Sequence, residues 1–111
     1  MRRRNFKGRC EKRSFSKSTT VCRLYSPLMA AFAEKLQTDD TVIAFECIVP
    51  MEGTELTSDF LITSEGGAKA IRECVPREKL ESAIVIKNLD MSLSYWRRHG
   101  ISDWKTVTES K

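Results

Sequence analysis

Two acidic residues, Asp59 and Glu73, are the best candidates for chemistry in this sequence. They lie in two β-type runs, residues 56–63 and 70–75, which the turn signal Ser64–Gly67 joins. Because side chains alternate along a strand, a loop of three residues places Asp59 opposite Glu73 on one sheet face. Two facing carboxylates repel each other unless a cation lies between them, so one interpretation of the pair is a site for a divalent metal ion. Two solvated carboxylates on an edge strand are the alternative interpretation.

A second feature is the uneven distribution of charge. Residues 1–23 contain nine basic residues and one acidic residue, a net charge of +8; since the whole chain carries +4, the remainder carries −4. The basic residues are Arg2, Arg3, Arg4, Lys7, Arg9, Lys12, Arg13, Lys17 and Arg23. A basic segment ahead of a mildly acidic body predicts binding to a nucleic-acid backbone, with DNA favoured over RNA. A solvated tail and an acidic protein surface remain as alternatives.

Turn and period signals predict the elements that must position these residues. The predicted elements are a helix at 26–38, strands at 41–49, 56–63 and 70–75, a helix at 89–99 and a last strand within 101–108. The second helix is predicted to bury Leu89, Leu93 and Trp96 on one face. Because a helix that joins two strands of one sheet implies a parallel crossover, the predicted fold class is α/β, with a small mixed β-sheet of about four strands and flanking helices.

The chain is expected to form one domain with a basic arm. We predict a flexible nucleic-acid-binding arm at 1–23, of which residues 1–20 order on binding, followed by an α/β domain at 24–111. Neither a membrane-spanning run nor a secretory signal is expected from the distribution of apolar residues. Two of the four cysteines, Cys47 and Cys74, fall in apolar strand runs and are predicted to be buried thiols, which favours a reducing, cytoplasmic setting.

Taken in order, several motifs resemble a known family. They are Thr41-Val42-Ile43-Ala44-Phe45 through Val49-Pro50, Thr57-Ser58-Asp59-Phe60-Leu61, Arg72-Glu73-Cys74-Val75, and Tyr95-Trp96-Arg97-Arg98-His99-Gly100-Ile101 through Val107-Thr108-Glu109. Over residues 26–109 this order resembles the restriction-endonuclease-like core of the PD-(D/E)xK nuclease superfamily, and in particular the N-terminal domain of the TnsA endonucleases of heteromeric transposons. The resemblance implies a phosphodiesterase centre in which Asp59 and Glu73 are catalytic and hold Mg²⁺ or Mn²⁺.

The chain departs from that family at two catalytic positions. The resemblance places a lysine at the position of Val75 and a helix carboxylate near residues 28–30, which are all apolar here. Losing the lysine removes a charge-stabilising donor of a kind that can contribute roughly 2.7–4 kcal/mol, and losing a carboxylate weakens Mg²⁺ binding. The candidate substitutes are Glu11 or Glu34 for the carboxylate and Lys69 or Lys79 for the lysine. We therefore predict an impaired site in which Asp59 and Glu73 are remnants.

Three functions are compatible with these features. The first is a nucleic-acid-binding protein of a mobile genetic element or phage, built on an impaired endonuclease fold. The second is a metal-dependent endonuclease subunit of a heteromeric transposase. The third is a phage or mobile-element inhibitor that docks on the nucleoprotein complex of a host defence system such as CRISPR. Metal-dependent nicking would identify the second function, and salt-sensitive binding of plain DNA or RNA would separate the first from the third.

Overall fold

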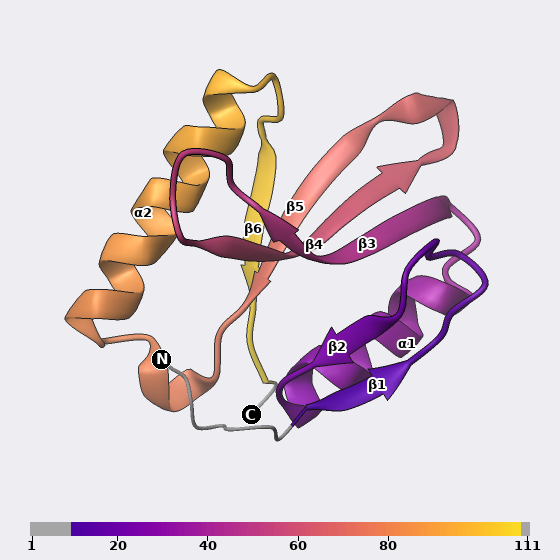
Figure 1. The fold of residues 1–111 in the computed structure, drawn as a ribbon, viewed down its shortest axis with the longest axis horizontal. Coiled ribbons are helices and arrows are strands. Elements are labelled where there is room, and N and C mark those ends of the chain that lie inside the picture. The colour runs from indigo at the N-terminus through magenta and orange to yellow at the C-terminus, as the bar shows by residue number, and fades with distance from the viewer. Residues whose placement is uncertain (1–9, 110–111) are drawn as a thin grey trace.

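Figure 1 shows the fold of the computed structural model, which describes residues 10–109. The strands are β1 (Glu11–Arg13), β2 (Cys22–Leu24), β3 (Val42–Pro50), β4 (Thr57–Ser64), β5 (Lys69–Cys74) and β6 (Asp103–Val107). The helices are α1 (Pro27–Thr38) and α2 (Ala83–Arg98), with short 3₁₀ turns at Glu65–Gly67 and Arg77–Lys79. Among these residues, no helix is long and apolar enough to cross a membrane.

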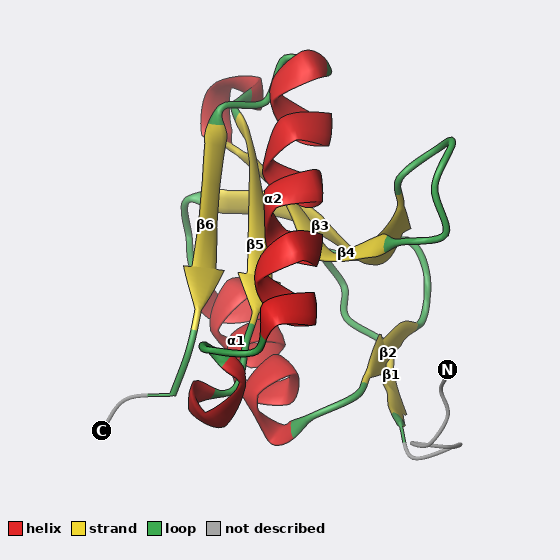
Figure 2. Ribbon diagram, turned by 90° about the vertical axis from the view of Figure 1, so that its left-hand side faces the viewer, coloured by secondary structure: helices red, strands yellow, loops and turns green. Residues whose placement is uncertain are grey.

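The main sheet has the mixed topology that the sequence predicts. Its strand order is β3-β4-β5-β6, in which the first two pairings are antiparallel and β6 runs parallel to β5. Helix α2 makes the crossover between β5 and β6, and Figure 2 shows its axis running alongside those two strands. The fold class is thus confirmed as α/β, with a four-stranded mixed sheet, a smaller two-stranded sheet of β1 and β2, and two helices.

Local signals explain where α1 and the β4–β5 loop form. The Ser26 hydroxyl accepts a hydrogen bond from the backbone N–H of Met29 at 3.1 Å and so caps α1, while Pro27 occupies its first turn. Between β4 and β5, Gly66 and Gly67 have φ angles of 84° and 88°, a conformation that glycine adopts without steric cost. The predicted loop of three residues is therefore confirmed at Glu65–Gly67.

The second helix begins six residues earlier than the sequence predicts, at Ala83 instead of residue 89. The Ser82 hydroxyl caps it by accepting from the backbone N–H of Val85 at 3.4 Å. The prediction missed these turns because Ile84, which is 62% exposed, breaks the expected pattern of a buried apolar face. Farther along, Trp96 is buried as predicted, but the other buried residues of the helix are Ser92 and Tyr95, whereas Leu89 and Leu93 are half-buried.

The main sheet separates two hydrophobic cores. On one side, Met29, Ala33 and Leu36 of α1 pack with Phe45 and Phe60 of the sheet. On the other side, α2 packs against the sheet, and this core is formed by Met51, Ile71, Tyr95 and Trp96 with half-buried neighbours that include Leu61 and Trp104. Burial of these side chains provides the main driving force for holding both helices on the sheet.

Residues 10–23, the described part of the predicted arm, are folded. This corrects, for these residues, the expectation that 1–20 order on binding and that 1–23 form a flexible arm. Strands β1 and β2 pair as an antiparallel hairpin. Phe15 is 9% exposed and its ring lies 5.5 Å from that of Phe45, while Cys22 is fully buried. The backbone N–H of Phe45 also donates to the carbonyl of Lys17 at 3.0 Å. Residues 10–23 thus belong to the body because they contribute apolar side chains to its core.

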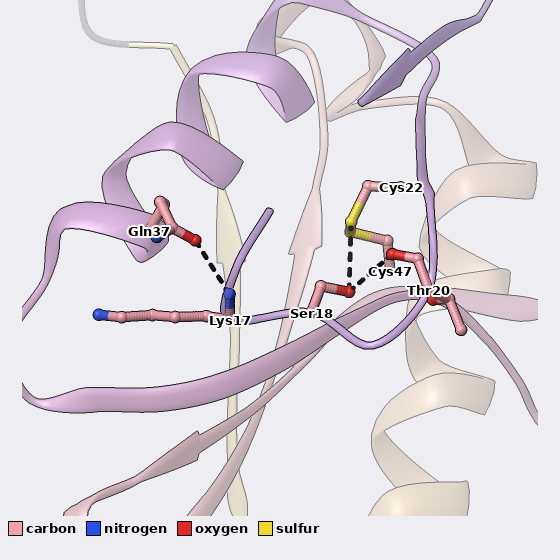
Figure 3. Close-up of a disulfide and its surroundings, with 6 residues drawn as sticks. All are labelled: Lys17, Ser18, Thr20, Cys22, Gln37 and Cys47. Atoms are coloured by element: carbon pink, nitrogen blue, oxygen red, sulfur yellow. Dashed lines mark hydrogen bonds between the residues drawn. A yellow bond between two sulfur atoms is a disulfide. The ribbon is translucent and has the colours of Figure 1, made fainter. Parts of the chain in front are cut away.

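A disulfide bond corrects a second expectation. Cys47, predicted to be a buried thiol, is bonded to Cys22, and the two Cα atoms are 5.4 Å apart (Figure 3). The bond joins β2 of the small sheet to β3 of the main sheet. Cys74 is a free thiol as predicted, although it is half-buried, and Cys10 is also free. The sequence contains no spacing that would have identified this pair, because its partners lie 25 residues apart on strands of different sheets.

Candidate functional site

The structure brings Asp59 and Glu73 together, as the predicted register requires. Phe60 pairs with Arg72 in the β4–β5 ladder, so the next positions along the two strands are Asp59 and Glu73. The backbone N–H of Asp59 donates to Glu73 Oε1 at 3.0 Å, and the backbone N–H of Cys74 donates to Asp59 Oδ2 at 2.8 Å. At this end of the hairpin, two backbone N–H groups therefore donate to side-chain carboxylates and not to the backbone carbonyl oxygens that accept them in an ordinary antiparallel ladder.

A buried polar network extends from Glu73 into α2 and β6. Glu73 Oε2 accepts from the Ser92 hydroxyl at 2.6 Å, and Ser92 Oγ accepts from the indole N–H of Trp104 at 2.9 Å. Ser58 Oγ accepts from the indole N–H of Trp96 at 2.8 Å and lies 3.3 Å from Ser92 Oγ. Three elements, β4, α2 and β6, thus contribute donors to the network around this carboxylate of β5, as a buried charge or polar group requires.

Burial sets the electrostatics of the acidic pair. Glu73 is 6% exposed, and burial raises its pKa, against the opposing effect of the hydrogen bonds that it accepts from Ser58, Ser92 and Asp59. Burial, and then the negative charge of Glu73, raises the pKa of Asp59 to about 7. Burial and the charges of the same two residues also raise the pKa of the Cys74 thiol. The raised pKa values of both acids favour proton binding by the pair, because burial disfavours two adjacent negative charges.

The backbone beside Asp59 is strained. Cys47 pairs with Phe60 and Val49 pairs with Ser58, so Ile48 is the β3 residue that lies alongside Asp59. Ile48 has a φ angle of 55°, which is uncommon for any residue with a Cβ and more so for a β-branched one. Such a conformation costs about 1–3 kcal/mol and persists where the surrounding structure holds it in place. The strain coincides with the acidic pair and not with a surface loop.

A cavity of about 240 Å³ opens beside the acidic pair. Its lining consists of Asp59, Glu73, Cys74, Val75, Pro76, Lys79, Val85, Asn88 and Leu89. A second cavity of about 240 Å³ shares Glu73, Asn88 and Leu89 with the first. Of the two lysines predicted as substitutes, Lys79 thus lines the cavity beside the pair, whereas Lys69 donates to the Thr63 hydroxyl at 2.8 Å near the opposite end of the β4–β5 hairpin.

The other predicted substitutes do not approach the acidic pair. Glu34 of α1 and Glu11 of β1 both form ion pairs with Arg13, at 2.7 Å and 3.4 Å. Val75, at the position of the expected lysine, is buried at 4% exposure. Within residues 10–109, no group of three or more His, Cys, Asp or Glu side chains is placed to hold a metal ion. The described chain thus supplies two adjoining carboxylates and one lysine near them, without a third acidic ligand.

The basic residues divide into a described and an undescribed group. Arg2, Arg3, Arg4, Lys7 and Arg9 lie outside the described residues. Lys12 and Arg23 face each other across the hairpin, since they are register partners, and both are exposed. Arg13 is held by its two acidic partners, and Lys17 Nζ donates to the carbonyl of Asp39 at 2.8 Å.

Sequence reasoning missed the serines of the polar network. Ser58 precedes Asp59 in the quoted strand motif, but nothing in that motif indicates that its hydroxyl accepts from an indole. Ser92 could have been found from its helical spacing, because it lies four residues before Trp96 on the buried face. Asn88, at the same spacing before Ser92, would then have been predicted to line the cavity.

Comparison with models of protein families found no match, and comparison with curated protein sequences found none either. The resemblance to the TnsA endonucleases therefore rests on the order and content of the quoted motifs. What the residues and their geometry can do chemically must carry any assignment of function.

Proposed function

We propose that this chain is a nucleic-acid-binding protein of a mobile genetic element or phage, with a TnsA-like endonuclease fold and an impaired nuclease site. The observation that supports binding most directly is the exposed pair Lys12 and Arg23, which are register partners on the β1–β2 hairpin. Like charges directly opposite each other destabilise a hairpin, and a phosphate group bound between them removes the repulsion. Residues 1–9, which immediately precede this hairpin, contribute five further basic residues.

The geometry of the acidic pair supports impairment. Both oxygens of Glu73 and one oxygen of Asp59 accept hydrogen bonds from the protein itself. A metal ion would have to compete with these donors, and Mg²⁺ requires several oxygen ligands in near-octahedral geometry. The apolar Val75 also leaves the catalytic lysine position without a cation. Together these features favour binding over catalysis.

Salt-dependent DNA binding tests the proposal. Fluorescence anisotropy of a labelled duplex, titrated at several NaCl concentrations, gives the slope of log affinity against log salt. We expect Lys12→Ala/Arg23→Ala to reduce the magnitude of that slope by about 1.8, since each phosphate contact contributes roughly 0.9 on B-DNA. The matched control is Lys87→Ala/Lys105→Ala, which removes the same charge from exposed positions on α2 and β6 and is expected to keep the slope.

Two outcomes would contradict the proposal. Equal effects of the two double variants would mean that net charge alone drives binding and that the hairpin is not the interface. Undetectable binding to DNA and RNA at low salt would instead favour the third function, in which the partner is a protein of a host nucleoprotein complex.

The cavity beside the acidic pair favours an endonuclease as the second candidate function. Lys79 lines the same cavity as Asp59 and Glu73, so this cavity contains a lysine from a different part of the chain than the one the family pattern specifies. In that case the chain would bind Mg²⁺ or Mn²⁺ through Asp59 and Glu73, and it would cut as one subunit of a heteromeric transposase.

The proposed nucleic-acid partner also implies action in the cytoplasm, where stable disulfides are rare.

A further inference from the structure

The Cys22–Cys47 bond connects the proposed binding hairpin to the body. Cys22 lies on β2 next to Arg23, and Cys47 lies on β3 of the main sheet. Figure 3 shows the two sulfur atoms between the strands, with Ser18 beside them. The bond therefore fixes β2, the strand that carries Arg23 of the proposed Lys12–Arg23 phosphate site.

The surroundings of the bond suit the reduced as well as the oxidised state. Cys22 Sγ lies 3.7 Å from Ser18 Oγ, and the Ser18 hydroxyl donates its own hydrogen to the carbonyl of Thr20 at 3.0 Å. Ser18 Oγ consequently presents a lone pair to Cys22. A sulfur in a disulfide has no hydrogen to give, whereas the reduced thiol can donate to that lone pair. A buried Cys22 thiol would thus find its acceptor already in place.

Other contacts hold the hairpin when the disulfide is absent. The carbonyl of Lys17 accepts from Phe45 at 3.0 Å, and the backbone N–H of Lys17 donates to the Gln37 side chain at 3.2 Å. The Gln37 amide donates in turn to the Ser16 hydroxyl at 2.7 Å. These contacts anchor the loop between β1 and β2, whereas β2 itself is anchored by the disulfide at Cys22 and by the burial of Leu24 in the core. Reduction would therefore loosen β2 without detaching the loop.

We propose that Cys22 and Cys47 form a reversible thiol–disulfide switch that sets how firmly β2, and with it Arg23, is held. A dithiol reductant attacks Cys47 Sγ, because Cys47 is half-buried whereas Cys22 is fully buried. The bond between the cysteines breaks, a mixed disulfide forms on Cys47, and Cys22 leaves as a thiolate that takes up a proton. The second thiol of the reductant then displaces Cys47, which leaves two cysteine thiols and one oxidised dithiol.

The consequence for binding rests on the proposed function. In the oxidised protein Arg23 stays opposite Lys12, so a phosphate meets a preformed pair of cations. In the reduced protein the pair must be ordered on binding, which lowers affinity. We expect the oxidised protein to bind DNA at least about fivefold more tightly than the reduced protein, the lower end of ordinary coupling between sites.

Hydrogen exchange on the full chain, with and without dithiothreitol, tests the switch independently of binding. We expect reduction to lower the protection of the β2 amides while those of β5 keep theirs. Cys22→Ala/Cys47→Ala is expected to behave as the reduced protein under both conditions. Cys10→Ser, which retains the bonded pair, should respond to dithiothreitol as the wild type does.

Each remaining outcome is decisive. Unchanged exchange of β2 on reduction would overturn the switch, and loss of protection throughout the molecule would show a purely structural disulfide. A redox response that persists in Cys22→Ala/Cys47→Ala would assign it to other thiols. If exchange responds as expected but neither redox state binds nucleic acid, the switch stands and the proposed function fails.

Discussion

At the scale of single residues, the acidic pair is held by a balance between burial and internal hydrogen bonding. Glu73 is almost completely buried, yet its two oxygens accept from Asp59 and Ser92. A carboxylate in such a place is stabilised by its donors in the charged form and by burial in the neutral form. Burial has the larger effect, so the pKa values of both acids are raised. The balance has consequences for stability and for catalysis.

The first consequence is a fall in stability as the pH rises. An acid whose pKa is higher in the folded protein binds more protons in that state, so folding is favoured at low pH and weakened as the acid ionises. We expect the contribution of the acidic pair to the free energy of unfolding to decrease from about pH 4, the ordinary carboxyl pKa, to about pH 7, the pKa of Asp59. Asp59→Asn should reduce this decrease, as urea unfolding at several pH values would show. An Asp59→Asn variant whose stability depends on pH as the wild type's does would contradict the raised pKa of Asp59.

The second consequence is weak or absent catalysis. Both carboxylates already accept hydrogen bonds from the protein, and Val75 occupies the lysine position. We therefore expect no useful cleavage of duplex DNA with Mg²⁺. Supercoiled plasmid nicking measures this, with Asp59→Ala as the matched control. Weak nicking restricted to Mn²⁺ agrees with impairment, since Mn²⁺ accepts less regular ligand sets. Clear Mg²⁺-dependent nicking that Asp59→Ala abolishes would show that Lys79 or another residue restores the site.

At the scale of elements, α2 combines packing with hydrogen bonding. Trp96 is buried against the sheet and its indole N–H donates to Ser58. We expect Trp96→Ala to lower the free energy of unfolding by about 3–5 kcal/mol, the range for truncating a buried aromatic side chain. Trp96→Phe keeps much of the packing but removes the donor, so about 1–3 kcal/mol should be lost. Chemical denaturation measures both values.

The exposed face of α2 provides the control. Met91 is 41% exposed, so Met91→Ala is expected to change stability by less than about 0.5 kcal/mol. A loss as large as that of Trp96→Ala would mean that another face of the helix packs on the sheet.

Elements with strong local signals could be predicted, whereas contacts between distant elements could not. The period-two runs and the Gly66–Gly67 turn were sufficient for β4, β5 and their register. The start of α2 was missed because exposed isoleucines such as Ile84 obscure the amphipathic pattern. The Ser58–Trp96 hydrogen bond depends on how the helix packs, which no local pattern encodes. The disulfide is a pairing of the same long-range kind.

At the scale of the whole molecule, we expect two parts of the basic N-terminus, residues 1–9 and 10–23, to have different roles. Deleting residues 1–9 removes five of the nine basic residues of 1–23, and it should flatten the salt slope by up to about 4.5 if all five contact phosphates. Deleting residues 1–20 also removes β1 and Phe15, so it should lower the free energy of unfolding by more than about 3 kcal/mol. Anisotropy and thermal unfolding of the two truncated chains measure these effects.

Equal stability of the two truncated chains would contradict the role of the hairpin in the core. An unchanged salt slope after removal of residues 1–9 would leave Lys12 and Arg23 as the main phosphate contacts.

The parallel pairing of β6 with β5 fixes when the polar network can close during synthesis. Trp104 of β6 donates to Ser92, and Ser92 donates to Glu73, so the cover over that carboxylate comes from segments made late. The antiparallel strands β3 to β5 can pair as soon as they emerge from the ribosome, because their contacts are local in sequence. We therefore expect Glu73 to remain hydrated while the 31 residues from 74 to 104 are added, so the acidic pair lies in water until α2 and β6 have been made.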